Sequence, residues 1–289
     1  MQIVKVTVLL FLVFLSGCAT YTPALTEKQK AAIDVIDVYH AVISNEIKVQ
    51  HARSNAGAMG AASGMGALGG LIGGLIEAGI NKNRAIKSDR KAVKYREMLG
   101  GYDFNAVVNN AVASVFSDSE LLSFNPVKSF PEGTKKFDIR TSSDSSAVLK
   151  LRSEYLLSPD QKNLELVLYY KMQISGSDSD SSKERKVVFQ SSDFDWSRDV
   201  FEEQIAFGAG IVAQLLLIDL NDTRSPEQMK EHLQDIQVAQ YSYNGNISKM
   251  KAYTLGASEE TGYRYYRLKN GDVYAISSDE SLKLQAKVS

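Results

Sequence analysis

Few residues of this chain combine the types and the spacing that enzyme or metal chemistry requires. Ser88 and Lys91 match the bare S-x-x-K spacing of acyl-serine enzymes, but no companion motif is present. Asp193 and Asp195 form a pair of carboxylates without a recognisable partner for general acid/base work. The histidines do not lie near a second ligand at metal-site spacing: His40, His51 and His232. We therefore expect no metal ion and no cofactor, and an enzyme is the least favoured function.

The chemistry that the sequence does favour lies at its single cysteine, Cys18. The basic residue Lys5 is followed by the apolar run Val6 to Leu15, and the small residues Ser16 and Gly17 lead to the cysteine. This is the pattern of a secretory signal, and the run is too short for a membrane span, which needs roughly 20 helical residues. We expect residues 1–17 to be a signal peptide that is removed.

The form LSGC, residues 15–18, closely resembles the lipobox of bacterial lipoproteins. This resemblance covers the first twenty residues and implies that Cys18 is acylated and becomes the first residue of the mature chain. It also implies a lasting lipid anchor, since each buried CH₂ contributes ~0.8 kcal/mol. Because Ala19 follows the cysteine, the resemblance implies the outer membrane as the location, facing the periplasm or the cell surface. An ordinary secretory signal with a chance cysteine is the alternative.

A second unusual segment, residues 55–80, holds nine of the chain's twenty glycines and no charge before Glu77. A glycine in a helix costs about 1 kcal/mol relative to alanine, so a helix here requires close packing that offsets this cost. The segment has small residues at four-residue spacing, which lets helix backbones approach closely in membranes. These residues are Gly60 and Gly64, followed by Gly66, Gly70 and Gly74.

The segment is similar to the glycine-zipper segments of envelope lipoproteins, which implies helix packing or homo-oligomerisation. The uncharged run 54–76 would reach about 35 Å as a helix, enough to cross a bilayer. Three interpretations stay open from the sequence. The run docks on the chain's own helices, it associates with a membrane, or it is a flexible linker.

The helices of the N-terminal half follow from caps and apolar stripes. Thr26 and Glu27 predict a helix start, and isoleucines at three- and four-residue multiples extend this helix to about Gln50: Ile33, Ile36, Ile43 and Ile47. A charged helix follows the glycine-rich run and ends at Gly100 and Gly101. Asp103 caps the next helix, which has one apolar stripe.

The middle of the chain predicts a two-layer α+β sandwich of helices on an antiparallel sheet. Alternating residues predict a hairpin of strands 147–157 and 164–174, with Leu168 facing the helices and Val167 facing away. A third strand follows at 186–194, a shorter one at Phe137 and Ile139, and a capping box of Asp199 and Glu202 opens a long helix. In outline this order is similar to periplasmic modules of secretion and envelope-assembly lipoproteins.

The C-terminal part predicts a short helix from Ser225 to about Ala239 and a small β-rich tail with Asn-Gly hairpins at residues 244–245 and 270–271. Seven tyrosines gather in this tail, either as strand residues or as an aromatic binding surface. The chain therefore divides into a signal peptide (1–17), a lipid-anchored stem with helices and the glycine-rich segment (18–101), the sandwich (102–224) and the tail (225–289).

Composition limits the function further. The chain has 33 basic and 34 acidic residues, so it lacks the basic field that sequence-independent nucleic-acid binding requires, and we expect no such partner. The sequence predicts a non-enzymatic, lipid-anchored protein that acts by binding an unknown envelope protein, as an accessory in envelope or surface-structure assembly. The alternative is a subunit of an oligomeric membrane pore or secretion channel that uses the glycine-rich segment.

Overall fold

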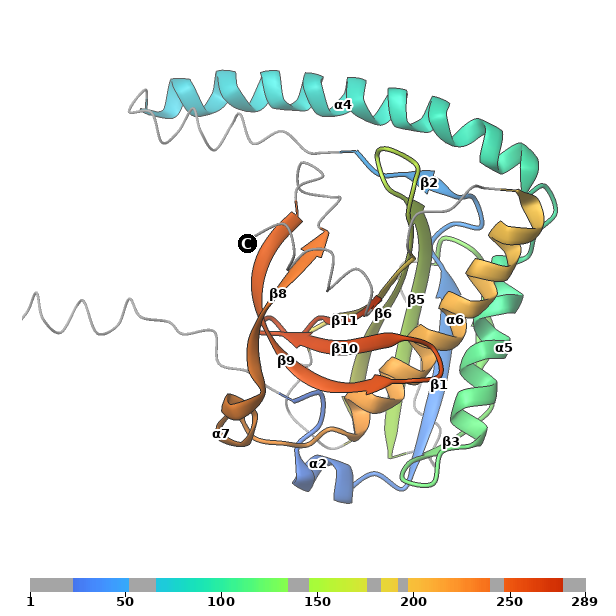
Figure 1. The fold of residues 1–289 in the computed structure, drawn as a ribbon, viewed down its shortest axis with the longest axis vertical. Helices are drawn as coiled ribbons and strands as arrows, with labels where there is room; N and C mark the ends of the chain where they lie inside the picture. The colour runs from blue at the N-terminus through green and yellow to red at the C-terminus, as the bar shows by residue number, and fades with distance from the viewer. Residues whose placement is uncertain are drawn as a thin grey trace, which may run out of the picture.

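The computed structural model describes residues 23–51, 66–134, 146–175, 183–191, 197–239 and 247–277. It confirms the α+β class: one mixed sheet of 11 strands has the helices α5 (Phe104–Ser117) and α6 (Arg198–Asn221) on one face (Figure 1). The strand order is β3-β1-β5-β6-β7-β11-β10-β9-β8, with β2 beside β5 and β4 beside β1. The short strand predicted at residues 137–139 lies outside the described residues.

The predicted helix from Thr26 to Gln50 is wrong beyond its first turn. Thr26 does form a capping box with Gln29, but α2 is only Glu27–Ala31. The chain then forms the strands β1 (Val35–Val42) and β2 (Lys48–Val49). β1 is rich in β-branched residues, which fit a pleated sheet better than a helix, and it lies between neighbours on both sides. Ile36 and Ile47 are fully buried, as core residues around the sheet.

The glycine-rich segment, from Gly66 onward, and the charged segment after it form one helix, α4 (Gly66–Met98). Its 33 residues correspond to a length of about 50 Å. The helix ends before Gly100 and Gly101 as predicted, and Gly101 has a φ of +81° that favours glycine. Figure 1 shows α4 crossing one end of the sheet.

The predicted hairpin is confirmed: β5 (Ala147–Leu157) and β6 (Leu164–Ile174) pair antiparallel over their full lengths, and β7 (Arg185–Gln190) follows on β6. The expectation of a wholly antiparallel sheet is wrong. β1 runs parallel to β5 and to the short strands β3 (Ser123–Phe124) and β4 (Lys128–Phe130). β2 also runs parallel to β5, and β11 (Val273–Ser277) runs parallel to β7. Long helical connections between these strands make parallel pairing possible, because they return the chain to the same end of the sheet.

The two helices on the sheet bury the faces that their sequences predict. Asp103 caps α5 by accepting a hydrogen bond from the amide of Ala106, and α6 buries its predicted stripe. The buried stripe residues of α6 include Phe201, Ile205, Val212 and Leu215. The predicted capping box is wrong, because Ser197 caps α6 and Glu202 instead forms an ion pair with Arg198.

The C-terminal strands belong to the same sheet as the hairpin. Ser225 caps a helix as predicted, but α7 is only Pro226–Met229. After a single 3₁₀ turn, the strands β8 (Leu233–Ala239), β9 (Ile247–Ser258), β10 (Tyr263–Leu268) and β11 follow. The hairpin at Asn270 and Gly271 is confirmed, with Gly271 at a φ of +93°, whereas residues 244–245 lie outside the described ranges. Since β11 pairs with β7, the sheet crosses the division drawn at residues 224–225.

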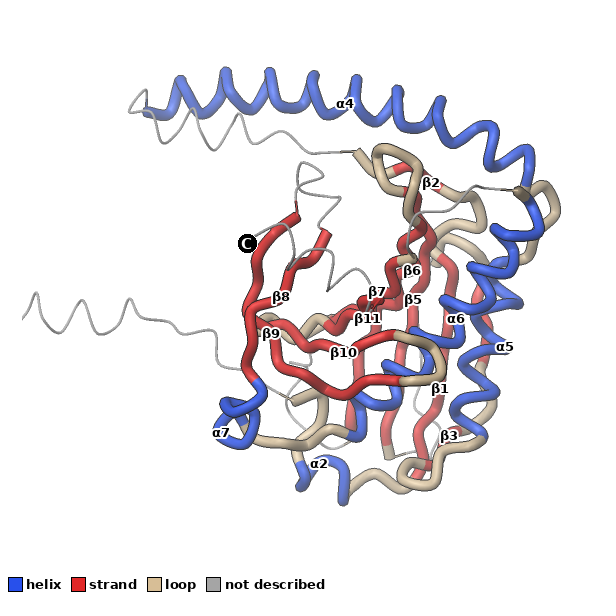
Figure 2. Tube along the Cα trace, viewed as in Figure 1, coloured by secondary structure: helices blue, strands red, loops and turns tan. Residues whose placement is uncertain are grey.

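The sheet curls, so that β8, β9 and β10 bend round towards the face that the helices leave open (Figure 2). A second apolar cluster fills this concave side, around Val167, Val188, Tyr266 and Ile276. Leu168 faces the helices and Val167 faces away from them, as predicted, but Val167 is also buried, at 1% exposure. The curl supplies the covering layer, which alternation along one strand does not encode.

Candidate functional site

The residues predicted to carry function lie at and beyond the edge of the described chain. Cys18, Gly60 and Gly64 lie outside the described residues. Gly66, Gly70 and Gly74 lie in the first turns of α4, and their four-residue spacing places them along one side of the helix. The helix that this spacing presupposes is thus present from Gly66 onward.

The C-terminal half of α4 is fixed to the domain. Ala92, Tyr95 and Leu99 are buried in the main core. The Ser88 hydroxyl donates to the Gln50 carbonyl at 3.4 Å, and the Lys91 ammonium donates to the Pro159 carbonyl at 2.9 Å. Ser88 and Lys91 therefore bind two different backbone carbonyls, which supports a structural role for this S-x-x-K pair.

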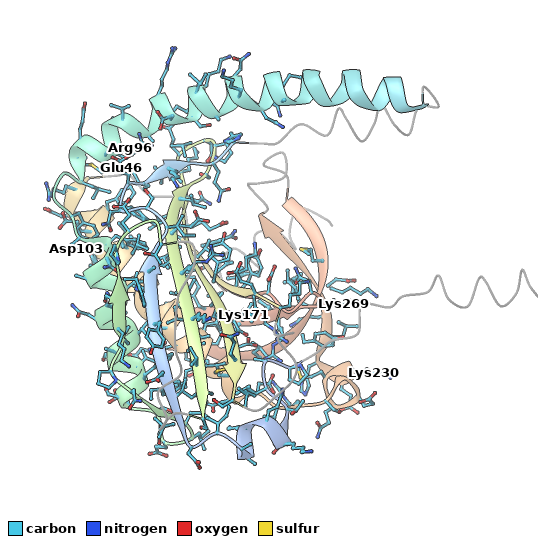
Figure 3. All side chains as sticks on the ribbon, turned by 180° about the vertical axis from the view of Figure 1, so that it is seen from behind. Glu46, Arg96, Asp103, Lys171, Lys230 and Lys269 are labelled. Carbon is cyan, nitrogen blue, oxygen red and sulfur yellow. The ribbon has the colours of Figure 1, made fainter. Side chains whose placement is uncertain are left out.

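A small cavity of about 250 Å³ lies beside the turn that ends α4. Tyr102 and Tyr155 line it, together with Glu46 and Arg96, whose carboxylate and guanidinium lie 3.3 Å apart. Figure 3 labels Glu46 and Arg96 close to each other at this end of the domain. Burial raises the pKa of Tyr102 to about 12, so its hydroxyl is neutral at physiological pH. The cavity is smaller than the roughly 300 to 1,000 Å³ of typical small-molecule sites.

The core contains a serine, a histidine and an asparagine in the order of a catalytic triad. His40 Nε2 lies 2.8 Å from Ser153 Oγ, and His40 Nδ1 lies 2.7 Å from Asn109 Oδ1. The Asn109 amide nitrogen donates to Ser129 and Asn105, which turns its oxygen towards the histidine. His40 Nδ1 is therefore the protonated nitrogen, and Nε2 accepts a hydrogen bond from the Ser153 hydroxyl.

The histidine and the serine of this triad-like group are sealed from solvent, whereas Asn109 is partly exposed. Both His40 and Ser153 are 0% exposed, and the one cavity described above has neither in its lining. Burial lowers the pKa of His40 to about 4, against a smaller rise from its hydrogen bond with Asn109, so the ring stays neutral. The group joins β1, β5 and α5 through satisfied hydrogen bonds, of which the one between His40 and Ser153 is buried, and this supports a structural role. Sequence spacing could not reveal it, since His40 and Ser153 are 113 residues apart.

A second buried polar group fastens the C-terminal end of α6 to the sheet. Arg267 Nε donates to Asp219 Oδ1 at 2.5 Å and Arg267 Nη1 donates to Asp222 at 2.9 Å, while the Tyr170 hydroxyl donates to Asp219. Burial raises the pKa of Asp219 to about 7, although the charge of Arg185 and the Tyr170 hydrogen bond lower it. Burial likewise lowers the pKa of Arg267 to about 9. Removing one partner of such a pair costs about 3 to 5 kcal/mol.

The stem that follows the predicted anchor is part of the fold. The Pro23 carbonyl accepts a hydrogen bond of 2.7 Å from Arg185 Nη2, and Leu25 is 1% exposed. The Thr223 hydroxyl, just after α6, donates to the Glu27 carboxylate. The sequence suggests only a short polar stem here, and Leu25 is the one residue whose apolar side chain could have indicated docking.

The tyrosines of the C-terminal strands are core residues where the structure describes them. Tyr253, Tyr263, Tyr265, Tyr266 and Tyr274 are all buried, with exposures of 3% to 7%. Tyr241 and Tyr243 lie outside the described residues. For the five buried rings, the aromatic strand interpretation holds and a binding surface does not.

Among the described residues, α6 is the one helix that is long and apolar enough to cross a membrane. More than half of the apolar stretch of α6 is buried in the core. In the same part of the chain, no three His, Cys, Asp or Glu side chains group as metal ligands. The chain matches no protein-family model, no characterised protein sequence and no solved structure at a significant level of similarity.

Proposed function

We propose that this protein is a lipid-anchored component of the bacterial envelope that acts by binding, as an accessory in envelope or surface-structure assembly. The observation that carries the proposal is Cys18 at the end of a basic and apolar leader, in the sequence LSGC. The fixed stem supports it, because Pro23, five residues after Cys18, is already bound to the domain by Arg185. The proposed location is the outer membrane, facing the periplasm or the cell surface.

Two features of the described chain support binding over catalysis. The Ser153–His40–Asn109 group has catalytic order, but its histidine and serine are 0% exposed. The cavity beside α4 is occupied at its edge by the Glu46–Arg96 ion pair and is small for a substrate. A protein with these features acts through its surfaces.

The surface we assign to an envelope partner or a second copy is the glycine-rich part of α4, residues 66–80. The C-terminal half of this helix is tied to the sandwich by the hydrogen bonds of Ser88 and Lys91, by buried Ala92 and Tyr95, and by buried Leu99 just after its end. Gly66, Gly70 and Gly74 let another helix approach the backbone closely. An isolated glycine-rich helix is costly, so a contact along this face would offset that cost.

A subunit of an oligomeric pore or secretion channel is the second candidate, favoured by the helical state of the chain from Gly66 onward. Within the described residues, however, α6 is apolar enough over a membrane-spanning length and α4 is not. Cross-linking in native membranes followed by extraction at high pH separates the two functions. Cross-linked oligomers up to the size of a ring, together with membrane retention that depends on the glycines, support the pore. Extraction of the protein without cross-linked oligomers supports the anchored binding protein.

The anchor itself is tested by Cys18→Ser. We expect this variant to lose all fatty-acid label and to be released or misprocessed, because the chain has one cysteine and hence one thiol for acylation. Metabolic labelling with a fatty acid, with Ser16→Ala as a control that keeps the thiol, measures the outcome. Equal label on the wild type and on Cys18→Ser would refute the proposed lipidation.

A further inference from the structure

The point at which the N-terminal chain enters the fold is fixed by three contacts. The Pro23 carbonyl is bound by the Arg185 guanidinium, Leu25 is buried in the main core, and Glu27 accepts a hydrogen bond from Thr223. Arg185 itself lies against the β10–β11 turn, since a Cβ added to Gly271 would lie 3.4 Å from its guanidinium. The stem therefore leaves the domain at one defined place.

That place is close in sequence to the proposed anchor. Cys18 and Pro23 are separated by five residue steps, and a fully extended chain spans at most about 3.6 Å per residue, or about 18 Å in total. An acylated cysteine lies at the level of the lipid headgroups. So short a tether does not let the domain turn freely or stand far from the membrane.

We propose that the surface around Pro23, formed by α2, the start of β7 and the β10–β11 turn, is the face that the domain presents to the bilayer carrying Cys18. This inference rests on the lipidation proposed above. The partner of this face is a lipid surface. The short chain between Cys18 and the fixed residue Pro23 is what directs this face towards the membrane.

The side chains of this tether face suit lipid headgroups. Lys28, Lys183 and Lys269 are exposed there, beside exposed Glu27 and Glu184. Glu184 forms an ion pair with Arg152, and Glu27 accepts a hydrogen bond from Thr223, so both carboxylates have a cation or a donor beside them. The lysine ammonium groups can therefore contact lipid phosphates, and the two carboxylates keep their own partners at the membrane surface.

The C-terminal half of α4 lies at the other end of the sheet. In the sheet, Arg185 lies opposite Tyr170, and Tyr170 lies opposite Leu151. α4 instead contacts Gln50 through Ser88, and the Gln50 amide donates a hydrogen bond to the Leu157 carbonyl. Leu157 is six residues beyond Leu151, which corresponds to about 20 Å along the strand. Figure 1 shows α2 and α4 at opposite ends of the domain, and Figure 3 shows Lys269 well away from Arg96 of α4. This half of α4 consequently stands away from the anchoring bilayer.

The test uses the full acylated protein, whose native thiol is consumed by the lipid. Lys269→Cys places a donor dye on the tether face, and Val93→Cys, at a residue of α4 that is 43% exposed, places it at the far end. Both are reconstituted into liposomes of phosphatidylethanolamine and phosphatidylglycerol with an acceptor dye on the headgroups. Given the strand distance above, we expect transfer at residue 269 to exceed transfer at residue 93 by about twofold or more.

The control is an insertion of about twenty Gly and Ser residues between Thr20 and Tyr21, which behaves as a flexible coil. We expect it to lower transfer at residue 269 to the level of residue 93. Equal or reversed transfer in the acylated protein, or no effect of the insertion, would overturn the tether face alone. Mass spectrometry of Cys18 and flotation with the liposomes are measured first, and a chain without acyl groups that does not float overturns the proposed lipidation together with this inference.

Discussion

Asp219 illustrates how folding changes the chemistry of a single residue. It lies at the end of α6, fully buried, in contact with Arg267 and Tyr170. Its pKa is raised from an ordinary value of 3.8 to about 7, chiefly because burial removes water from the carboxylate. At mildly acidic pH the folded state therefore holds a proton that the unfolded state has already released.

This proton difference predicts a sign for the pH dependence of stability. Because the folded state binds more protons between about pH 4 and pH 7, the contribution of Asp219 to the free energy of unfolding is present at low pH and is lost as pH rises to about 7. Each pKa unit corresponds to about 1.4 kcal/mol. Asp219→Asn cannot titrate, so we expect the advantage of the wild type over this variant to shrink across this range.

Urea unfolding of the soluble chain beginning at residue 19, at a series of pH values, measures this difference. Glu203→Gln is the matched control, because Glu203 is exposed on the same helix. It should follow the wild type at every pH. A constant difference between Asp219→Asn and the wild type across the series would contradict the assignment.

At the scale of the elements, two glycines of α6 separate helix propensity from packing. A Cβ added to Gly208 would lie 2.6 Å from a ring carbon of Phe189 on β7, whereas one added to Gly210 would meet nothing within 4 Å. The Phe189 ring has little room to move, because it is 0% exposed and its centroid lies 5.3 Å from that of Tyr263. Gly208 thus sets the close approach of α6 to the sheet.

We expect Gly210→Ala to raise the stability and Gly208→Ala not to raise it. Both gain about 1 kcal/mol of helix propensity, but overpacking at residue 208 costs typically 1 to 3 kcal/mol. Gly208→Ala should be neutral to destabilising, and Gly210→Ala should stabilise the soluble chain. Denaturant midpoints decide, and an equal gain in the two variants would show that the Phe189 contact is looser than described.

At the scale of the whole molecule, α4 joins a folded domain to a glycine-rich surface. If Gly66, Gly70 and Gly74 form a close-contact face, Gly70→Leu should separate the packed helices, although leucine gains roughly 0.8 kcal/mol of helix propensity over glycine. If that face joins copies of the proposed lipid-anchored protein, we expect Gly70→Leu to abolish the oligomer. If the face is intramolecular, the melting temperature falls without a change in assembly.

Cross-linking in membranes and thermal melting measure the two outcomes. Ile72→Ala, which lies between Gly70 and Gly74 in sequence but on another side of the helix, is the control and should leave the glycine face intact. A Gly70→Leu protein that is more helical, equally assembled and equally stable would identify the run as a linker. That result would also contradict the pore alternative.

The sequence by itself determined the features that depend on neighbouring residues. Caps at Thr26, Asp103 and Ser225 and the Asn270–Gly271 turn are local hydrogen-bond and dihedral patterns, and the structure has all four. The stripes of α5 and α6 and the β5–β6 hairpin follow from apolar periodicity in the same way. The predicted anchor at Cys18 is equally local, because a leader and a lipobox are contiguous.

Only the tertiary structure decided what depends on residues far apart in the chain. The isoleucines of residues 33–47 fit a helical stripe, yet the neighbours of β1 on both sides make it a strand. The curl that buries Val167, the parallel pairings, the Asp219–Arg267 contact and the docking of Pro23 on Arg185 join segments that are tens of residues apart. Periodicity shows which side of an element is apolar, but not which distant segment covers it, because that choice belongs to the packing of the whole chain.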